Sequence, residues 1–164
     1  MTRWGVDMGS RKQTKSAAPW ESTKRGKETF STLYASMLKS EAYNDLSYTA
    51  QALYTRCKLR RYGVKEEERP PGYDKDDKST YTLFYMNRAY YRSFGMCEKT
   101  FINAMRQLVS HGFIDVVHIG GVTRGKSVFN LDCSQWRVWD KDKGCKLSQT
   151  AKEYLKDRPI RSVF

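Results

Sequence analysis

Residues 87–119, NRAYYRSFGMCEKTFINAMRQLVSHGFIDVVHI, decide the fold. Asn87 is a favourable N-cap for a short helix, and Gly95 ends that helix. Residues 97–110 carry apolar side chains at the spacing of one helical face, which predicts the strongest helix of the chain. Gly112 terminates it. A short helix, a glycine turn and a longer helix together predict a helix-turn-helix.

The flanking segments extend this pattern on both sides. Residues 113–119 alternate like a strand, 120–127 (GGVTRGKS) form a basic glycine-rich connection, and 128–131 return as the partner strand. Upstream, Ser47 can cap a helix that runs to about residue 62, and 81–86 are typical of a short strand. The order predicts an α+β winged helix-turn-helix, with a three-helix core and a β-hairpin wing.

The chain divides into three parts by composition. Residues 1–29 hold seven basic and three acidic side chains with almost no apolar periodicity, which predicts a mobile basic arm. Residues 30–139 are expected to form the winged-helix domain. Residues 140–164 are expected to form a basic, flexible tail, with a short helix over 148–157.

Two segments of the predicted domain lie outside the helix-turn-helix and its hairpin. Residues 30–38 have helical apolar spacing, and Ser40 to Asp45 is expected to break that helix. Residues 64–79 hold six acidic and four basic side chains and a Pro-Pro-Gly sequence, which predicts a solvated loop insertion.

The composition narrows the class of protein. The 164 residues carry a net charge of +12, and a polyanion such as nucleic acid is the partner that this charge favours. No apolar run reaches the roughly 18 residues of a membrane span, and the basic N-terminus is unlike a secretory signal. Four scattered cysteines suit the reducing cytoplasm. These are Cys57, Cys97, Cys133 and Cys145.

The predicted recognition helix has a polar face suited to DNA. An α-helix fits the major groove, where Asn and Gln can pair with adenine and Arg with guanine. Arginines on the preceding helix and basic residues in the wing can contact phosphates. The candidate DNA-binding residues are Lys99, Thr100, Asn103, Arg106 and Gln107 on the recognition helix, Arg88 and Arg92 before it, and Arg124 and Lys126 in the wing.

Signals for catalysis, metals and cofactors are weak, so we expect no enzyme and no bound cofactor. Cys97 and His111 stand at opposite ends of one helix, about 21 Å apart at 1.5 Å per residue, too far for proton transfer. The aspartates of the acidic loop alternate with lysines, which favours solvent over a metal site. Residues 120–127 fit the spacing of a phosphate-binding loop but precede a strand rather than a helix.

Three stretches resemble a known type of protein: MLKSEAYNDLSYTAQALYTRCKLRRYG (37–63), TFINAMRQLVSHGFIDVV (100–117) and SVFNLDCSQWRVW (127–139). They are similar to winged-helix proteins of bacterial phages, plasmids and integrative mobile elements, which are replication-initiator-like. The resemblance implies sequence-dependent binding of double-stranded DNA, in replication initiation or transcriptional control. The matching positions are Met37, Leu38, Ser40, Ala42, Leu46, Ala50, Leu53, Tyr54, Thr100, Phe101, Leu108, Gly112, Phe113, Ile114 and Trp136.

Two alternatives stay open. The domain could be an adaptor that recruits a replication or recombination protein through a surface containing Tyr90, Tyr91, Trp136 and Trp139, although aromatic residues are more often buried. It could also bind structured RNA, although no exposed aromatic platform is evident. The sequence leaves the oligomeric state open; because no leucine heptad is present, a dimer would have to form through the N-terminal segment, the tail or the wing region.

Overall fold

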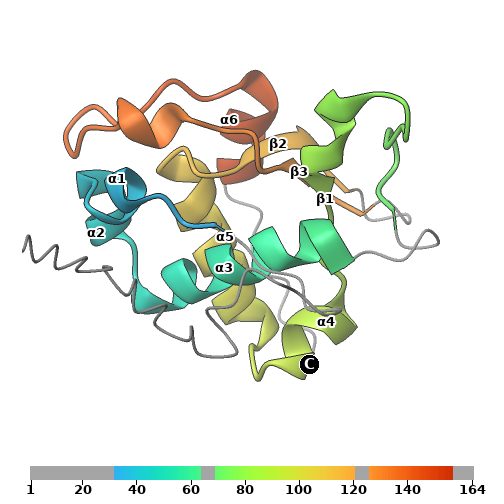
Figure 1. Ribbon diagram of the computed structural model, residues 1–164. Coiled ribbons are helices and arrows are strands. Elements are labelled where there is room, and N and C mark those ends of the chain that lie inside the picture. Colours follow the sequence, from blue (N-terminus) through green and yellow to red (C-terminus); the bar gives the residue numbers. More distant parts are fainter. Residues whose placement is uncertain (1–31, 64–68, 121–125, 157–164) are drawn as a thin grey trace, which may run out of the picture.

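Helices α3 (Tyr48–Gly63) and α5 (Glu98–Ser110) pack against each other at the centre of the fold (Figure 1). The computed structural model describes residues 32–63, 69–120 and 126–156, without the side chains of 61–63. The remaining elements are α1 (Ala35–Leu38), α2 (Glu41–Asp45), η2 (Lys78–Thr82), β1 (Leu83–Phe84), α4 (Arg88–Ser93), β2 (Asp115–His118), β3 (Val128–Asn130), η3 (Gln135–Arg137) and α6 (Gln149–Leu155).

Local signals place the main helices where the sequence predicts them. The Oγ atom of Ser47 accepts a hydrogen bond from the backbone N–H of Ala50 at 3.3 Å, which caps α3. The side chain of Asn87 accepts the N–H of Tyr90 at 2.7 Å, which caps α4. The α3 and α5 faces that the apolar spacing predicts are buried. Their fully or nearly buried members are Ala50, Leu53, Tyr54 and Cys57 on α3, and Phe101, Ala104, Met105, Leu108 and Val109 on α5.

Gly112 directs the chain from α5 into the sheet. Its φ of +75° lies in the left-handed region, which side chains other than glycine adopt only with strain. A Cβ atom at this position would lie 2.6 Å from the Cβ of Gln135, so the space is also closed. Both facts require glycine at position 112, where the sequence predicts that a glycine ends the helix.

The sheet has three antiparallel strands in the order β1-β3-β2. Phe129 on the central strand pairs with Phe84 of β1 on one side and with Val116 of β2 on the other. The register between β2 and β3 shifts between Val116 and His118. The buried side chains of these strands complete the core against the helices.

Helix α6 packs against both β2 and α5, beside the sheet in Figure 1. Ala151 is fully buried, and the ring of Tyr154 meets Phe129 edge-on at 5.7 Å between centroids. Ser148 caps the helix by accepting the N–H of Ala151 at 3.1 Å. The predicted helix within 148–157 is therefore present, and it covers the core.

Three local expectations are corrected. The predicted break at 40–45 contains the short helix α2, because Ser40 caps it and Ala42 is buried. The predicted strand over 81–86 is reduced to Leu83–Phe84, because the two residues before it belong to the 3-10 helix η2. The predicted helix over 30–38 begins only at Ala35. Its first two residues lie outside the described part of the chain.

The α+β class is confirmed: several helices accompany one small antiparallel sheet. Among the described residues, no helix is long and apolar enough to cross a membrane. The predicted basic arm at 1–29 lies outside the described residues, as do the wing tip at 121–125 and the end of the chain after residue 156.

Candidate nucleic-acid interface

Aromatic packing holds α4 and α5 together. The rings of Tyr91 and Phe101 stack with their centroids 4.3 Å apart and their planes 11° apart. The N–H of Met96 donates to the carbonyl of Tyr91 at 3.1 Å, and Gly95 adopts a φ of +80° between the two helices. The turn therefore places the exposed side of α4 beside the first turn of α5.

Helix α4 carries two basic side chains. Arg88 and Arg92 of α4 are exposed, as sequence analysis expects. Burial raises the pKa of Tyr91, and the charges of Arg88 and Arg92 oppose that rise while Glu98 adds to it. The two arginines and Glu98 therefore lie close enough to the Tyr91 hydroxyl to act on it electrostatically.

The first two turns of α5 present the polar side chains that the helical spacing predicts. Lys99, Thr100 and Asn103 are all exposed. The Oγ1 atom of Thr100 lies 3.1 Å from the Sγ atom of Cys97, and this contact lowers the pKa of the exposed thiol. Lys99 and Asn103 are thus presented to solvent on the helix that follows α4 in the chain.

Further along α5, the side chains of Gln107 and Arg106 lie against neighbouring elements instead of pointing freely into solvent. The Oε1 atom of Gln107 accepts the backbone N–H of Ser47 at 2.9 Å, which caps the start of α3. Arg106 is half-buried, and its charge acts on Tyr154 of α6, whose pKa burial raises to about 12. The outward-facing part of α5 is therefore concentrated in its N-terminal half.

The connection between β2 and β3 contributes one described basic residue. Arg124 lies outside the described residues, whereas Lys126 is exposed. The Nζ atom of Lys126 stands 4.3 Å from the centroid of the Tyr85 ring, just after β1. The N–H of Gly120 donates to the Oγ atom of Ser127 at 3.0 Å, which ties the two ends of the connection together.

Sequence reasoning missed two arginines of α3 that pack against aromatic rings of α4 and of the turn after it; Arg56 is exposed, whereas Arg60 is only 7% exposed. The guanidinium of Arg56 lies 5.3 Å from the centroid of Phe94, in the turn between α4 and α5. The guanidinium of Arg60 lies 4.7 Å from the centroid of Tyr90 in α4. The signal was their four-residue spacing in RCKLRR, which puts both on one face of a helix.

The aromatic residues considered for an adaptor surface are mostly covered. Tyr91 is 5% exposed and Trp136 is 8% exposed. Tyr90 is half-buried against Phe94, and Trp139 is half-buried against His111 at 4.6 Å between ring centroids. The packing gives these four rings a structural role.

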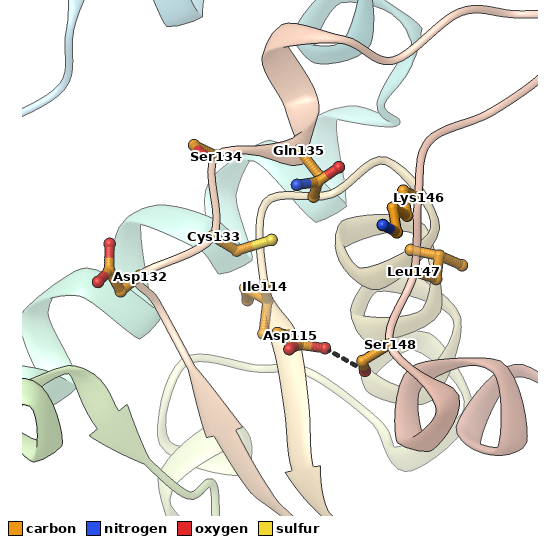
Figure 2. A pocket seen from close by; sticks show the side chains of 9 residues that line it. All are labelled: Ile114, Asp115, Asp132, Cys133, Ser134, Gln135, Lys146, Leu147 and Ser148. Carbon is orange, nitrogen blue, oxygen red and sulfur yellow. Dashed lines mark hydrogen bonds between the residues drawn. The ribbon is translucent and has the colours of Figure 1, made fainter.

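A pocket of about 360 Å³ opens between the start of β2, the segment after β3 and the segment before α6 (Figure 2). Asp115 and Ser148 face each other in it, and the Ser148 hydroxyl donates to Asp115 at 2.6 Å. Asp115 also accepts the N–H of Val116. These polar groups are engaged in holding α6 to β2.

The histidine and the loop aspartates that could suggest catalysis or metal binding make structural contacts. The Nε2 atom of His111 lies within hydrogen-bond distance, 2.9 Å, of the Asp45 carboxylate, which links the end of α5 to α2. Asp74 and Asp77 accept backbone N–H groups of their own loop. Within the described ranges, no group of three or more His, Cys, Asp or Glu side chains could hold a metal ion.

Comparison of the chain with protein-family models, with curated proteins and with solved structures finds no match.

Proposed function

We propose that this chain is a winged helix-turn-helix protein that binds double-stranded DNA in a sequence-dependent way. Its role would be replication initiation or transcriptional control in a phage, plasmid or integrative element, as the sequence resemblance implies. The protein acts by binding alone and performs no chemistry on the DNA.

The arrangement of elements supports this proposal. A helix (α3), a strand, a helix-turn-helix (α4 and α5) and a two-stranded hairpin follow one another, and the first strand pairs with the last. In such an arrangement the second helix of the pair is free to enter the major groove, which is about 12 Å wide. The hairpin stands beside it and can reach the neighbouring backbone.

One observation carries the proposal: α4 and the first two turns of α5, two consecutive helices, both expose basic or amide side chains. Arg88 and Arg92 offer charge-assisted hydrogen bonds to phosphates, and Lys99 stands at the start of the inserted helix. Asn103 lies one turn further, where an amide can pair with adenine. Side chains suited to phosphates and a side chain suited to reading a base thus lie on two consecutive helices.

The first experiment compares duplex DNA, the matched single strand and a structured RNA by fluorescence anisotropy at two salt concentrations. We expect duplex to bind best, with log affinity falling by about 0.9 per phosphate contact for each tenfold rise in salt. Replacing Arg88→Gln together with Arg92→Gln should weaken binding and make the salt dependence shallower by about two contacts.

The matched control replaces Lys141→Gln together with Lys143→Gln, which removes the same charge. These exposed lysines belong to the turn bridged by Asp140 and Gly144, on a different part of the molecule from α4 (Figure 1). If the arginine pair and the lysine pair lose duplex affinity equally, the protein responds only to net charge and the role of α4 is wrong. Preference for the RNA, or no binding of nucleic acid at all, would favour RNA recognition or the adaptor function instead.

A further inference from the structure

Four residues from four different parts of the fold meet beside the proposed interface. Arg60 lies on α3, Tyr85 follows β1, Tyr90 lies on α4, and Lys126 ends the connection between β2 and β3. Their aromatic rings and cations are in contact, and we call them the cation–aromatic cluster. It is the point where the connection, the first strand and the helix-turn-helix approach one another.

The ring of Tyr85 is shared by two cations. The Lys126 ammonium lies 4.3 Å from its centroid, and the Arg60 guanidinium lies 5.7 Å from it. The same guanidinium lies 4.7 Å from the centroid of Tyr90. Tyr85 and Arg60 are only 5% and 7% exposed, and cation–aromatic attraction is strongest where water is excluded.

Arg60 and Lys126 both carry positive charge, so they would repel each other if the Tyr85 ring were absent. The electron-rich face of Tyr85 offsets the repulsion between Arg60 and Lys126, so the ring determines where the lysine can stay. At this end of the connection, the Oγ atom of Ser127 also accepts the N–H of Gly120. Strand β3 pairs with β1 at two positions only, and its register with β2 is irregular near His118.

We propose that Tyr85 is a positioning residue, which holds Lys126 and the end of the β2–β3 connection beside α4, while Arg60 fixes the ring against Tyr90. The role rests on the proposed function, because the positioned charge serves duplex binding. A duplex approaching α4 and α5 would then meet Lys126 at a set place rather than on a freely moving chain. The ring thereby reduces the ordering cost of that phosphate contact.

The test separates positioning from binding by using a readout that needs no DNA. Hydrogen exchange is measured by mass spectrometry over residues 126–130 and over α6 in Tyr85→Leu and Tyr85→Phe. Phenylalanine keeps the ring face and should preserve the wild-type rates. Leucine should speed exchange over 126–130 by about two- to fivefold and leave α6 unchanged, since it removes a cation–aromatic contact to an exposed lysine.

Two further variants keep the test decisive. Lys126→Gln changes an exposed side chain, so it should fold normally and also speed exchange over 126–130. Met37→Ala removes a buried side chain in α1 and serves as a remote destabilising control, which should not act selectively on 126–130. If Leu and Phe at position 85 give the same pattern, or if the control reproduces the effect of Leu, the positioning role is wrong.

Duplex affinity supplies the second arm. If Tyr85 acts through Lys126, the affinity losses of Tyr85→Leu and Lys126→Gln should be far from additive in the double variant, and Tyr85→Phe should retain wild-type affinity. Additive losses would contradict the proposal. If wild-type protein binds no duplex, the proposed function fails, and the exchange data alone still decide whether Tyr85 positions the connection.

Discussion

Gln107 and Ser47 are joined by a hydrogen bond across 60 residues of sequence: the backbone N–H of Ser47 donates to the Oε1 atom of Gln107 at 2.9 Å. A side chain that sequence analysis assigns to DNA recognition therefore supports the start of α3. This placement makes Gln107 and Asn103, one turn apart on α5, a matched pair for separating stability from binding.

The Gln107→Ala variant should be less stable, because it leaves the Ser47 N–H without this acceptor. We expect a loss of about 1 kcal/mol in the free energy of unfolding in urea, with little direct change in duplex affinity. Asn103→Ala should show the reverse, with stability within about 0.5 kcal/mol of wild type and a loss of about 1–3 kcal/mol in binding a preferred site. A stable Gln107→Ala variant that bound DNA weakly would contradict this division.

Gly112→Ala should be among the most destabilising small substitutions in the chain. The variant combines a φ of +75° with a Cβ placed 2.6 Å from that of Gln135, so the start of η3 must move. We expect a loss of about 3 kcal/mol or more, measured by urea unfolding. Gly144→Ala is the matched control, since its φ is +69° and its Cβ would meet nothing within 4 Å. The control should cost about 1–2 kcal/mol, and equal losses would refute the role of the Gln135 contact.

Ser148→Ala should loosen α6. The Ser148 hydroxyl caps the helix at the N–H of Ala151 and donates to Asp115 at 2.6 Å, so one substitution removes both bonds. A loss of about 1–2 kcal/mol in unfolding free energy is expected, with faster amide exchange in Gln149–Leu155. Ser148→Thr retains the hydroxyl and should retain most of the stability. Unchanged exchange in the alanine variant would show that α6 is held by apolar packing alone.

Alkaline pH should destabilise the fold through Tyr154. Burial raises the pKa of Tyr154 from its ordinary value of 10.0 to about 12, so the folded state keeps its phenol protonated when the unfolded state loses the proton. This contribution is complete below pH 10 and is lost as the pH rises towards 12, by about 2–3 kcal/mol. Urea unfolding at a series of pH values tests it. Tyr154→Phe should show a smaller loss across the same range, whereas an identical loss would assign the effect to other groups.

Much of the helical framework could be predicted because its signals are local. The caps Ser47, Asn87 and Ser148 and the terminator Gly112 act within a few residues, and the apolar spacing of α3 and α5 reports directly which face is buried. The short helix α2 was missed because five residues carry too little periodicity, and its stability comes from packing such as Tyr43 against Phe113.

The polar face of α5 was predicted less completely, because contacts with other elements of the fold cover part of it. Helical spacing identifies the side away from the core, but it does not say which neighbours flank that side. The start of α3 engages Gln107, and Tyr154 of α6 lies near Arg106. The roles of Arg56 and Arg60 of α3 were missed for a related reason, because their aromatic neighbours Phe94 and Tyr90 come close only when α3 is packed beside α4.

The strand order β1-β3-β2 also has a consequence for how the chain folds. Phe84 finds its partner strand only when Phe129 arrives, whereas α3, α4 and α5 all precede β3 in the chain. Closing that long loop costs entropy before any pairing is gained. During synthesis the helices can therefore assemble first. The two outer strands must wait for the central one, so the last strand to leave the ribosome completes the sheet.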